Sequence, residues 1–275
     1  MKFKYLGTAA AEGLPSPFCT CDTCKEAMRR GGKDIRTRSQ AVIDDKILID
    51  FGPDTYANSY KYKIRLSDIH HCLVTHDHCD HFAKDEFFCF TGGYIQVDKN
   101  APKFTLYGSE DIANKLGSNL EKGAEKLKFV EVSPFEPFYI DEYKVTALPA
   151  IHSSPKPYIY IIEKDNKTIL YANDTDIFPD SVWEYFKDNK LYFDFISFDC
   201  TSGNLEVLDY VGHMCIGYIK RCRDKMKKNG YIDEKTIMCL NHFSHNGPDV
   251  LYDDMNKIAQ EEGFIVSYDG MELEI

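Results

Sequence analysis

The stretch "THDHCDHF", residues 75–82, places three histidines, two aspartates and one cysteine within eight positions. A tight loop of this kind can point alternate side chains into one cavity. Imidazole and carboxylate are the ligands that suit zinc, manganese or iron at neutral pH. The preceding residues "HHCLV" read as a strand that enters the core. Because burying such groups without partners is costly, we interpret the stretch as half of a metal centre rather than an exposed polar loop.

The composition is that of an ordinary globular protein. The chain has 275 residues, 43% hydrophobic and 28% charged, which is enough for one sizeable core. Its net charge of −11 disfavours broad binding to nucleic acid or to anionic lipid. A small anionic substrate stays compatible with this charge, because a local metal charge can outweigh the distant surface.

The first residues, "MKFKYLGTAA", lack the apolar segment of a signal peptide, and no apolar run is long enough to span a bilayer. We therefore expect a cytoplasmic protein without a membrane partner. Ten cysteines in a cytoplasmic chain favour metal binding and buried thiols over disulfides. Those expected to be buried free thiols are Cys72, Cys89, Cys200, Cys215, Cys222 and Cys239.

Short β-like runs alternate with helical segments, without repeats or linkers. Hairpins are predicted around the turns at 44–46 and 165–167, and buried strands at 193–199 and 236–242. The carboxyl end reads as a strand, a turn at Asp269–Gly270 and an edge strand. The predicted helices are Ser109–Leu116, Pro179–Asp188, Gly212–Lys228 and Pro248–Gly263.

Polar side chains recur where predicted strands end. His76, His152, Asp174, Asp199 and His242 each follow or close such a strand. Loops at the carboxyl ends of strands often converge on one site in α/β enzymes. One layered α/β domain over residues 1–275 explains this pattern better than two separate domains.

The motif His76-x-His78-x-Asp80-His81 resembles the HxHxDH signature of the metallo-β-lactamase superfamily of binuclear metallohydrolases. The resemblance continues in order through His152, Asp174 and His242, over nearly the whole chain. It implies a four-layered αββα sandwich with the metals at one edge, between the two sheets.

The resemblance also implies a ligand set for two divalent ions, Zn²⁺ or Mn²⁺. The first metal would take His76, His78 and His152; the second would take Asp80, His81 and His242; Asp174 would bridge both. Two adjacent ions lower the pKa of a bound water, so that a metal-bridging hydroxide exists at neutral pH, and they clamp the oxygens of the ester. Asp80 would orient that hydroxide.

A second metal site is predicted near the amino terminus. Cys19, Cys21 and Cys24 have C-x-C-x-x-C spacing, and three thiolates favour a structural Zn²⁺. His245, three residues beyond His242, is the candidate fourth ligand. The alternative, a reactive or disulfide-forming trio, fits an odd cysteine number and a cytoplasmic chain less well.

Four segments narrow the resemblance. "GTAAAEGLPSPFCTCDTC", "THDHCDH", "NHFSH" and "YDGMEL" are together similar to the PhnP-like branch of phosphoribosyl cyclic phosphate phosphodiesterases. This implies a phosphodiesterase that opens a small cyclic phosphate. Asp199 and His213 match an Asp–His pair near the scissile phosphate, where the imidazole stabilises phosphorane oxygens or protonates the leaving alkoxide. A structural role for His213 at a helix start is the alternative.

We therefore predict a metal-dependent phosphoric diester hydrolase for a small cyclic or nucleotide-like phosphate. The alternatives are a tRNA 3′-end endonuclease-like, thioester- or β-lactam-hydrolysing enzyme on the same fold, and a non-enzymatic module with purely structural metals. A tRNA enzyme should show a basic stripe, so nucleic acid is disfavoured as a partner; a homodimer is left open. The aromatic insert at 87–111 is expected either to shape the pocket or to pack in the core.

Overall fold

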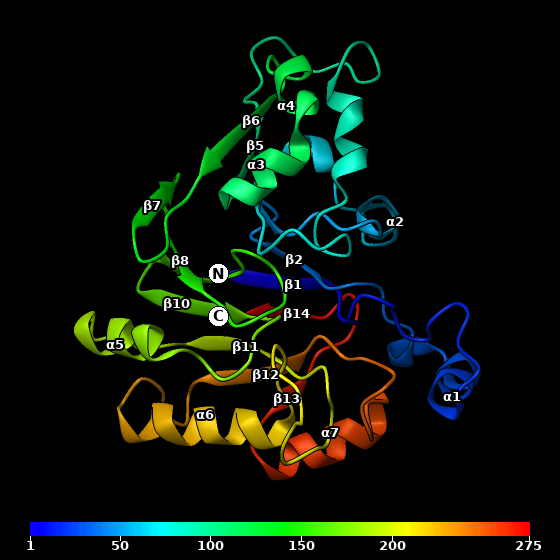
Figure 1. The fold of residues 1–275 in the computed structure, drawn as a ribbon, viewed down its shortest axis with the longest axis vertical. Helices are drawn as coiled ribbons and strands as arrows, with labels where there is room; N and C mark the ends of the chain where they lie inside the picture. Colours follow the sequence, from blue (N-terminus) through cyan, green and yellow to red (C-terminus); the bar gives the residue numbers. More distant parts are fainter.

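Two seven-stranded mixed sheets pack face to face in the computed structural model, which describes residues 1–275 (Figure 1). The first sheet has the order β14 (Glu272–Glu274), β1 (Lys2–Gly7), β2 (Gln40–Ile43), β3 (Ile47–Ile49), β4 (His71–Leu73), β5 (Phe104–Gly108) and β6 (Leu127–Glu131). The second has the order β13 (Ile265–Val266), β12 (Ile237–Asn241), β11 (Phe195–Asp199), β10 (Lys167–Ala172), β9 (Tyr158–Lys164), β8 (Tyr143–Pro149) and β7 (Pro137–Ile140).

Helices cover the outer face of each sheet, which completes four αββα layers and confirms the predicted fold class (Figure 1). The helices are α1 (Asp22–Arg30), α2 (Thr55–Lys61), α3 (Glu110–Leu116), α4 (Ser118–Lys122), α5 (Asp180–Asp188), α6 (Ile216–Lys228) and α7 (Tyr252–Glu261), with short 3₁₀ turns at Gly32–Asp34, Leu66–Asp68 and Lys84–Phe90. In Figure 1, α2, α3 and α4 lie in the upper part of the molecule beside the first sheet, and α5, α6 and α7 lie in the lower part beside the second. None of these helices is long and apolar enough to cross a membrane.

Strand direction brings the functional loops to one edge of the molecule. In the second sheet β10, β11 and β12 are parallel, and β8 runs the same way because β9 is antiparallel to both β8 and β10. In the first sheet β3, β4 and β5 are parallel. The carboxyl ends of parallel strands meet at one sheet edge, so the loops after β8, β10, β11 and β12 are neighbours.

The core between the sheets consists of alternate side chains from both inner faces. Tyr5 from β1 donates its hydroxyl hydrogen to Ser197 Oγ of β11 at 2.8 Å, so this buried polar group is satisfied across the sheet interface. The rings of Phe3 and Phe195 lie 4.9 Å apart, and both side chains are fully buried. Aromatic packing of this kind holds the two sheets together.

Both hairpins form where the sequence predicted them, with turns at residues 44–46 and 165–166. The predicted helices exist, but two were placed too early: α6 begins at Ile216 rather than Gly212, and α7 at Tyr252 rather than Pro248. Gly212 has a φ of +116° and its carbonyl oxygen contacts His152, so residues before Ile216 form a loop at the site instead of a helical turn.

Replacing Phe195 with alanine tests the role of the aromatic contact. Phe195→Ala should lower the free energy of unfolding by about 3–5 kcal/mol, because a large buried ring leaves a cavity between the sheets. Denaturant unfolding followed by circular dichroism measures the loss. Tyr60→Ala is the control, since that side chain is 81% exposed; equal effects of the two changes would contradict the assignment.

Candidate metal centre

The loop after β4 is closed by short backbone hydrogen bonds. The amides of His81 and Phe82 both donate to the carbonyl oxygen of His78, at 3.1 and 2.8 Å. The loop also packs directly on Gly52, where an added Cβ would lie 2.1 Å from the Asp80 carbonyl oxygen. Only glycine permits this close approach of the two backbones, so the position of the loop depends on a glycine at residue 52.

The structure brings the predicted ligands into two adjoining groups. The ligand atoms of His76, His78 and His152 lie within 4.8 Å of one another, and so do those of Asp80, His81 and His242. Asp174 lies between the groups, because its Oδ1 lies 3.7 Å from His152 Nε2 of the first group and its Oδ2 lies 3.0 Å from His242 Nε2 of the second. These two groups contain the residues that the resemblance assigned to two metals, and Asp174 is close to both.

Hydrogen bonds on the outer ring nitrogens orient two imidazoles. His152 Nδ1 donates to the Gly212 carbonyl oxygen at 2.9 Å, and His78 Nε2 donates to the Ser153 carbonyl oxygen at 3.3 Å. The remaining nitrogens, His152 Nε2 and His78 Nδ1, face each other at 3.1 Å. Because each ring carries its proton on the nitrogen that donates to a carbonyl oxygen, His152 Nε2 and His78 Nδ1 each keep a free lone pair. The two lone pairs point at the same space, as those of two ligands of one cation do.

Asp50, which follows β3, organises a second pair of imidazoles. Its carboxylate accepts hydrogen bonds from His81 Nδ1 at 2.7 Å and from the Thr75 amide at 2.8 Å. The Thr75 hydroxyl also donates to Asp50, and it accepts from His76 Nδ1 at 3.0 Å. The Nδ1 atoms of both rings are therefore engaged, and their Nε2 atoms are free to bind a cation, as in carboxylate–histidine–metal arrangements.

The site fits divalent cations on its own geometry. His76 Nε2 and Asp174 Oδ2 are buried and lack a hydrogen-bond donor or acceptor in the protein. Buried polar atoms without a partner are unfavourable, and a cation between the imidazoles and carboxylates would satisfy both. Nitrogen and carboxylate donors suit zinc or manganese.

The charges of the site are strongly coupled. Burial lowers the pKa of His81, but the carboxylates of Asp174, Asp80 and Asp50 outweigh burial and raise that pKa well above its usual value. Burial likewise raises the pKa of Asp174, but His242 and His81 outweigh it and hold the carboxyl well below its usual range. These imidazoles and carboxylates therefore favour opposite charges on one another.

Backbone strain gathers at the same place. Asp50, Asp174 and His242 have φ values of 68°, 53° and 66°, in the left-handed region that side chains other than glycine rarely adopt. Each of the three immediately or closely follows a strand end and carries a site group. Strain concentrated at such residues is typical of functional sites, where the surrounding packing enforces it.

Asp199 and His213 form the expected pair beside the metal ligands. Asp199 is fully buried at the end of β11 and accepts from His213 Nδ1 at 2.9 Å. Burial lowers the pKa of His213, but the Asp199 carboxylate outweighs this and raises it to about 9. Thr201 links the pair to the ligands, because its Oγ1 lies 3.1 Å from His213 Nδ1 and 2.8 Å from His242 Nδ1.

An open cleft of about 490 Å³ leads to these groups. Its floor contains His78, Asp80, His152, Asp174 and His242. The other lining residues are Ala10, Ala11, Glu12, Ser153, Thr201, Ser202, Leu205, Tyr210, His213, Ser244, Asn246 and Gly247. Lysine and arginine are absent from the lining.

The aromatic insert at 87–111 does not line this cleft. Phe87 and Phe104 pack in the core outside the first sheet, and Phe90 packs against that core. Phe90 and Phe104 also line a separate cavity of about 690 Å³. Of the two expectations for the insert, core packing is therefore the one that the structure supports.

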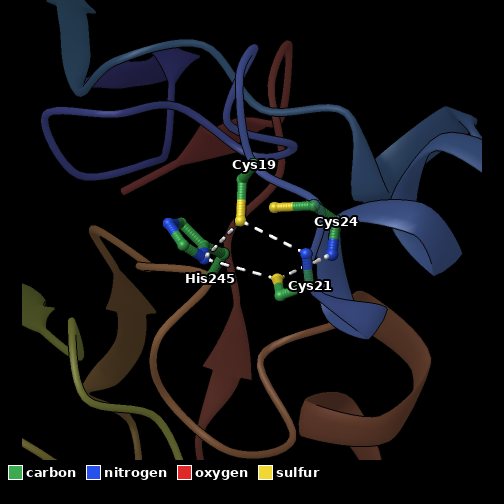
Figure 2. Close-up of side chains that lie close together, drawn as sticks. All are labelled: Cys19, Cys21, Cys24 and His245. Atoms are coloured by element: carbon green, nitrogen blue, oxygen red, sulfur yellow. Dashed lines mark hydrogen bonds between the residues drawn. The ribbon is translucent and has the colours of Figure 1, made fainter.

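The amino-terminal cysteines converge with His245, as Figure 2 shows. Cys21 caps α1, Cys24 lies in its first turn, and His245 comes from the segment after β12. His245 Nδ1 lies 3.6 Å from Cys19 Sγ and 3.5 Å from Cys21 Sγ. Zinc bonds of about 2.3 Å to sulfur and about 2.0 Å to nitrogen at tetrahedral angles give a similar separation. These side chains could therefore hold one zinc ion with little movement.

Sequence reasoning missed Asp50 and Glu12. Asp50 follows the strand "ILI", so the strand-end pattern that identified Asp174 would also have found it. Glu12 lies in an irregular segment, and only the packing of that segment on the loop after β12 places it in the cleft.

Comparisons with known proteins agree with the fold. The model of a β-lactamase superfamily domain matches residues 45–228, a range from the β3 strand to the end of α6. A search of curated proteins by sequence gives no match.

Three solved structures illustrate the likeness. A new diphosphatase from the PhnP family has a TM-score of 0.76 at 20% identity, over 100% of this chain and 97% of the other. Zinc-bound PqqB from Methylobacterium extorquens has a TM-score of 0.72 at 18% identity, and the match covers 100% of both chains. The short form of human tRNase Z has a TM-score of 0.64 at 16% identity, and the match covers 100% of this chain and 99% of the other. At these identities the likeness establishes the fold, and at that level it confirms the predicted resemblance to PhnP-like proteins.

Asp50→Asn tests the orientation of His81. The change should weaken divalent-metal binding by about 10- to 100-fold, because the carboxylate that fixes the His81 tautomer is lost. Titration of metal-free protein with Zn²⁺ or Mn²⁺ in the presence of a competing chelator measures this. Asp68→Asn, at an exposed position, should leave the affinity unchanged; wild-type affinity in Asp50→Asn would contradict the role.

Proposed function

The chain belongs to the β-lactamase superfamily, and from this membership we propose that it is a binuclear metal-dependent phosphodiesterase for a small cyclic or nucleotide-like phosphate. The superfamily supports a metal-dependent hydrolase; the phosphodiester substrate and the two-metal site are our proposal. The observation that carries it is the convergence of two ligand groups on Asp174, with the Asp199–His213 pair beside them.

Two divalent ions, zinc or manganese, would be held as the sequence predicted, one by His76, His78 and His152 and one by Asp80, His81 and His242, with Asp174 shared. Bound there, they would supply a Lewis-acidic centre that activates water and neutralises phosphate charge.

The protein groups around this centre have separate tasks. Asp80 Oδ2 lies 3.0 Å from His81 Nε2 at the cleft floor, where a carboxylate can orient an attacking water by accepting its hydrogen bond. His213 uses Nδ1 for Asp199, so Nε2 is the ring nitrogen available to a substrate. From that atom it can donate to a phosphoryl oxygen or protonate a departing alkoxide.

The proposed phosphodiester is supported over a thioester or β-lactam by this extra donor. A phosphorane spreads negative charge over several oxygens, so a protonated imidazole beside the metal ligands is useful there. Two of the similar structures are described as a diphosphatase and a tRNase, names that belong to those proteins but point in the same direction. The lining without lysine or arginine and the net charge of −11 favour a small substrate over a tRNA.

We also propose a structural zinc at Cys19, Cys21, Cys24 and His245. Burial raises the pKa of the Cys24 thiol to about 12, whereas the Cys24 amide, which donates to Cys21 Sγ, lowers that of Cys21 to about 6. One thiolate is thus already formed at neutral pH without metal, and zinc binding would deprotonate the others.

Loss of either group of ligands should abolish activity. His78→Ala and Asp174→Ala are expected to reduce hydrolysis of bis(p-nitrophenyl) phosphate to background, because each removes a ligand at the cleft floor. Release of p-nitrophenolate by Mn²⁺-loaded protein measures this, together with metal content by mass spectrometry. The control His70→Ala alters a histidine of the separate cavity and should remain active; full activity in either ligand variant would refute the proposed centre.

A substrate panel separates the phosphodiesterase from the alternatives. Cyclic ribose phosphates, cyclic nucleotides, linear phosphodiesters and thioesters are compared with the same Mn²⁺-loaded enzyme. We expect turnover of phosphodiesters in preference to thioesters. Faster thioester hydrolysis would overturn the proposed substrate class while leaving the metallohydrolase intact, and no turnover at all would favour a module with structural metals.

Cys21→Ser should separate the thiolate site from the chemistry. Bound zinc should fall by one equivalent and the melting temperature by several degrees, because the serine hydroxyl is a poor zinc ligand. The kcat of the metal-loaded centre should change less. Cys79→Ser, an exposed position within the HxHxDH motif, is the control; a loss of kcat in Cys21→Ser with unchanged zinc and melting would contradict a structural role.

A further inference from the structure

Glu12 places a negative charge on the wall of the proposed phosphodiester cleft. Its segment is held by Ala10, whose amide donates to the Phe243 carbonyl oxygen at 3.0 Å, just after β12. Lysine and arginine are absent from the cleft lining, so no cationic side chain of that kind faces this carboxylate there. The lining of the proposed phosphodiester site thus includes an acidic side chain.

The Glu12 carboxylate is held in place by contacts from the loop after β12. It accepts the hydroxyl hydrogen of Ser244, and its Oε1 lies 3.8 Å from His245 Nε2. The Ser244 amide in turn donates to the Thr201 carbonyl oxygen at 3.2 Å. Both Glu12 contacts engage Oε1, and the Glu12 side chain is 28% exposed. A carboxylate has about four acceptor positions, so several remain for a bound molecule.

The neighbouring wall groups are neutral. Ser202, Ser244 and Asn246 offer hydroxyl and amide groups, while Leu205 and Tyr210 offer apolar surface. The Tyr210 hydroxyl is hydrogen-bonded to Ser202 Oγ, which fixes the ring, and 46% of the residue stays exposed. Such a wall suits a ring that carries hydroxyl groups and does not suit a second phosphate.

We propose that Glu12 determines substrate specificity by accepting hydrogen bonds from hydroxyl groups on the part of the substrate that lies beyond the scissile phosphate. The same charge repels substrates that carry a second phosphate at that position. The preferred class is then a phosphodiester with a neutral, hydroxylated end, such as a nucleoside or sugar. This inference rests on the proposed phosphodiesterase function and narrows its substrate.

Three chromogenic probes with one leaving group test the idea. They are the p-nitrophenyl esters of uridine 5′-phosphate, of 2′,3′-dideoxyuridine 5′-phosphate and of uridine 3′,5′-bisphosphate esterified at the 5′-phosphate. In the wild type, kcat/KM for the diol should exceed that for each of the other two by about tenfold or more, because hydrogen bonds to a charged acceptor discriminate strongly. A wild type that does not prefer the diol overturns the proposal.

Two substitutions separate hydrogen bonding from charge. Glu12→Ala should bring the diol-to-dideoxy ratio close to one. Glu12→Gln keeps an acceptor oxygen of the same reach, so it should retain part of that ratio while improving turnover of the 3′-phosphorylated probe by about tenfold. Wild-type ratios in both variants would overturn the role of Glu12. Because each ratio is taken within one protein, it is insensitive to differences in active fraction.

The controls keep this test apart from the proposed function itself. Hydrolysis of bis(p-nitrophenyl) phosphate, which has no hydroxyl group, reports on the phosphodiesterase alone, and its absence in the wild type would refute that function instead. Glu206→Gln removes the same charge near the cleft, where the carboxylate pairs with Lys220 at 2.7 Å, and should keep the wild-type ratios. Unchanged zinc content and melting temperature exclude damage to the thiolate site as the cause.

Discussion

The approach of two imidazoles to one buried carboxylate is the constraint on which the rest of this structure depends. Asp174 Oδ2 lies 3.1 Å from His81 Nε2 and 3.0 Å from His242 Nε2, and it has no hydrogen-bond donor of its own. Such a group is stable only if positive charge is close by. The imidazoles of His81 and His242 lie next to it, and a divalent cation suits the same place.

Bringing these atoms together requires the two sheets to present their strand ends at a common edge. The backbone amide of Asp174 donates to Asp199 Oδ2 at 2.9 Å, so the ends of β10 and β11 are tied to each other as well as to the site. On the other sheet, Asp50 joins the end of β3 to the loop after β4 through Thr75 and His81. The carboxylates that orient ligands therefore also hold neighbouring strand ends in register, and fold and site stabilise one another.

The sequence predicted those parts of the site whose geometry is local or whose order along the chain is informative. The HxHxDH loop is one short turn, so its motif brought His76, His78, Asp80 and His81 together as candidate ligands, and the structure has them close together. Asp50 stands at a strand end that the same pattern could have flagged, but its contact with Thr75 depends on the parallel pairing of Ile49 with Leu73. The start of α6 was misplaced because the contact between Gly212 and His152 joins residues 60 positions apart. Interactions of this kind cannot be read from periodicity.

The thiolate cluster and the cleft share one wall, and this gives the amino-terminal segment a role beyond stability. His245 presents Nδ1 to Cys19 and Cys21 and turns Nε2 toward Glu12, so the same imidazole joins a candidate zinc site to the cleft. The candidate ligands in the cleft come from strand ends. The wall that contains Glu12 comes from an irregular segment, which is hydrogen-bonded to the loop after β12 through Ala10. In the proposed function, chemistry and selectivity are thus carried by separate parts of the chain. Changes at Glu12 would then alter which phosphodiester binds while the proposed strand-end ligands stay in place.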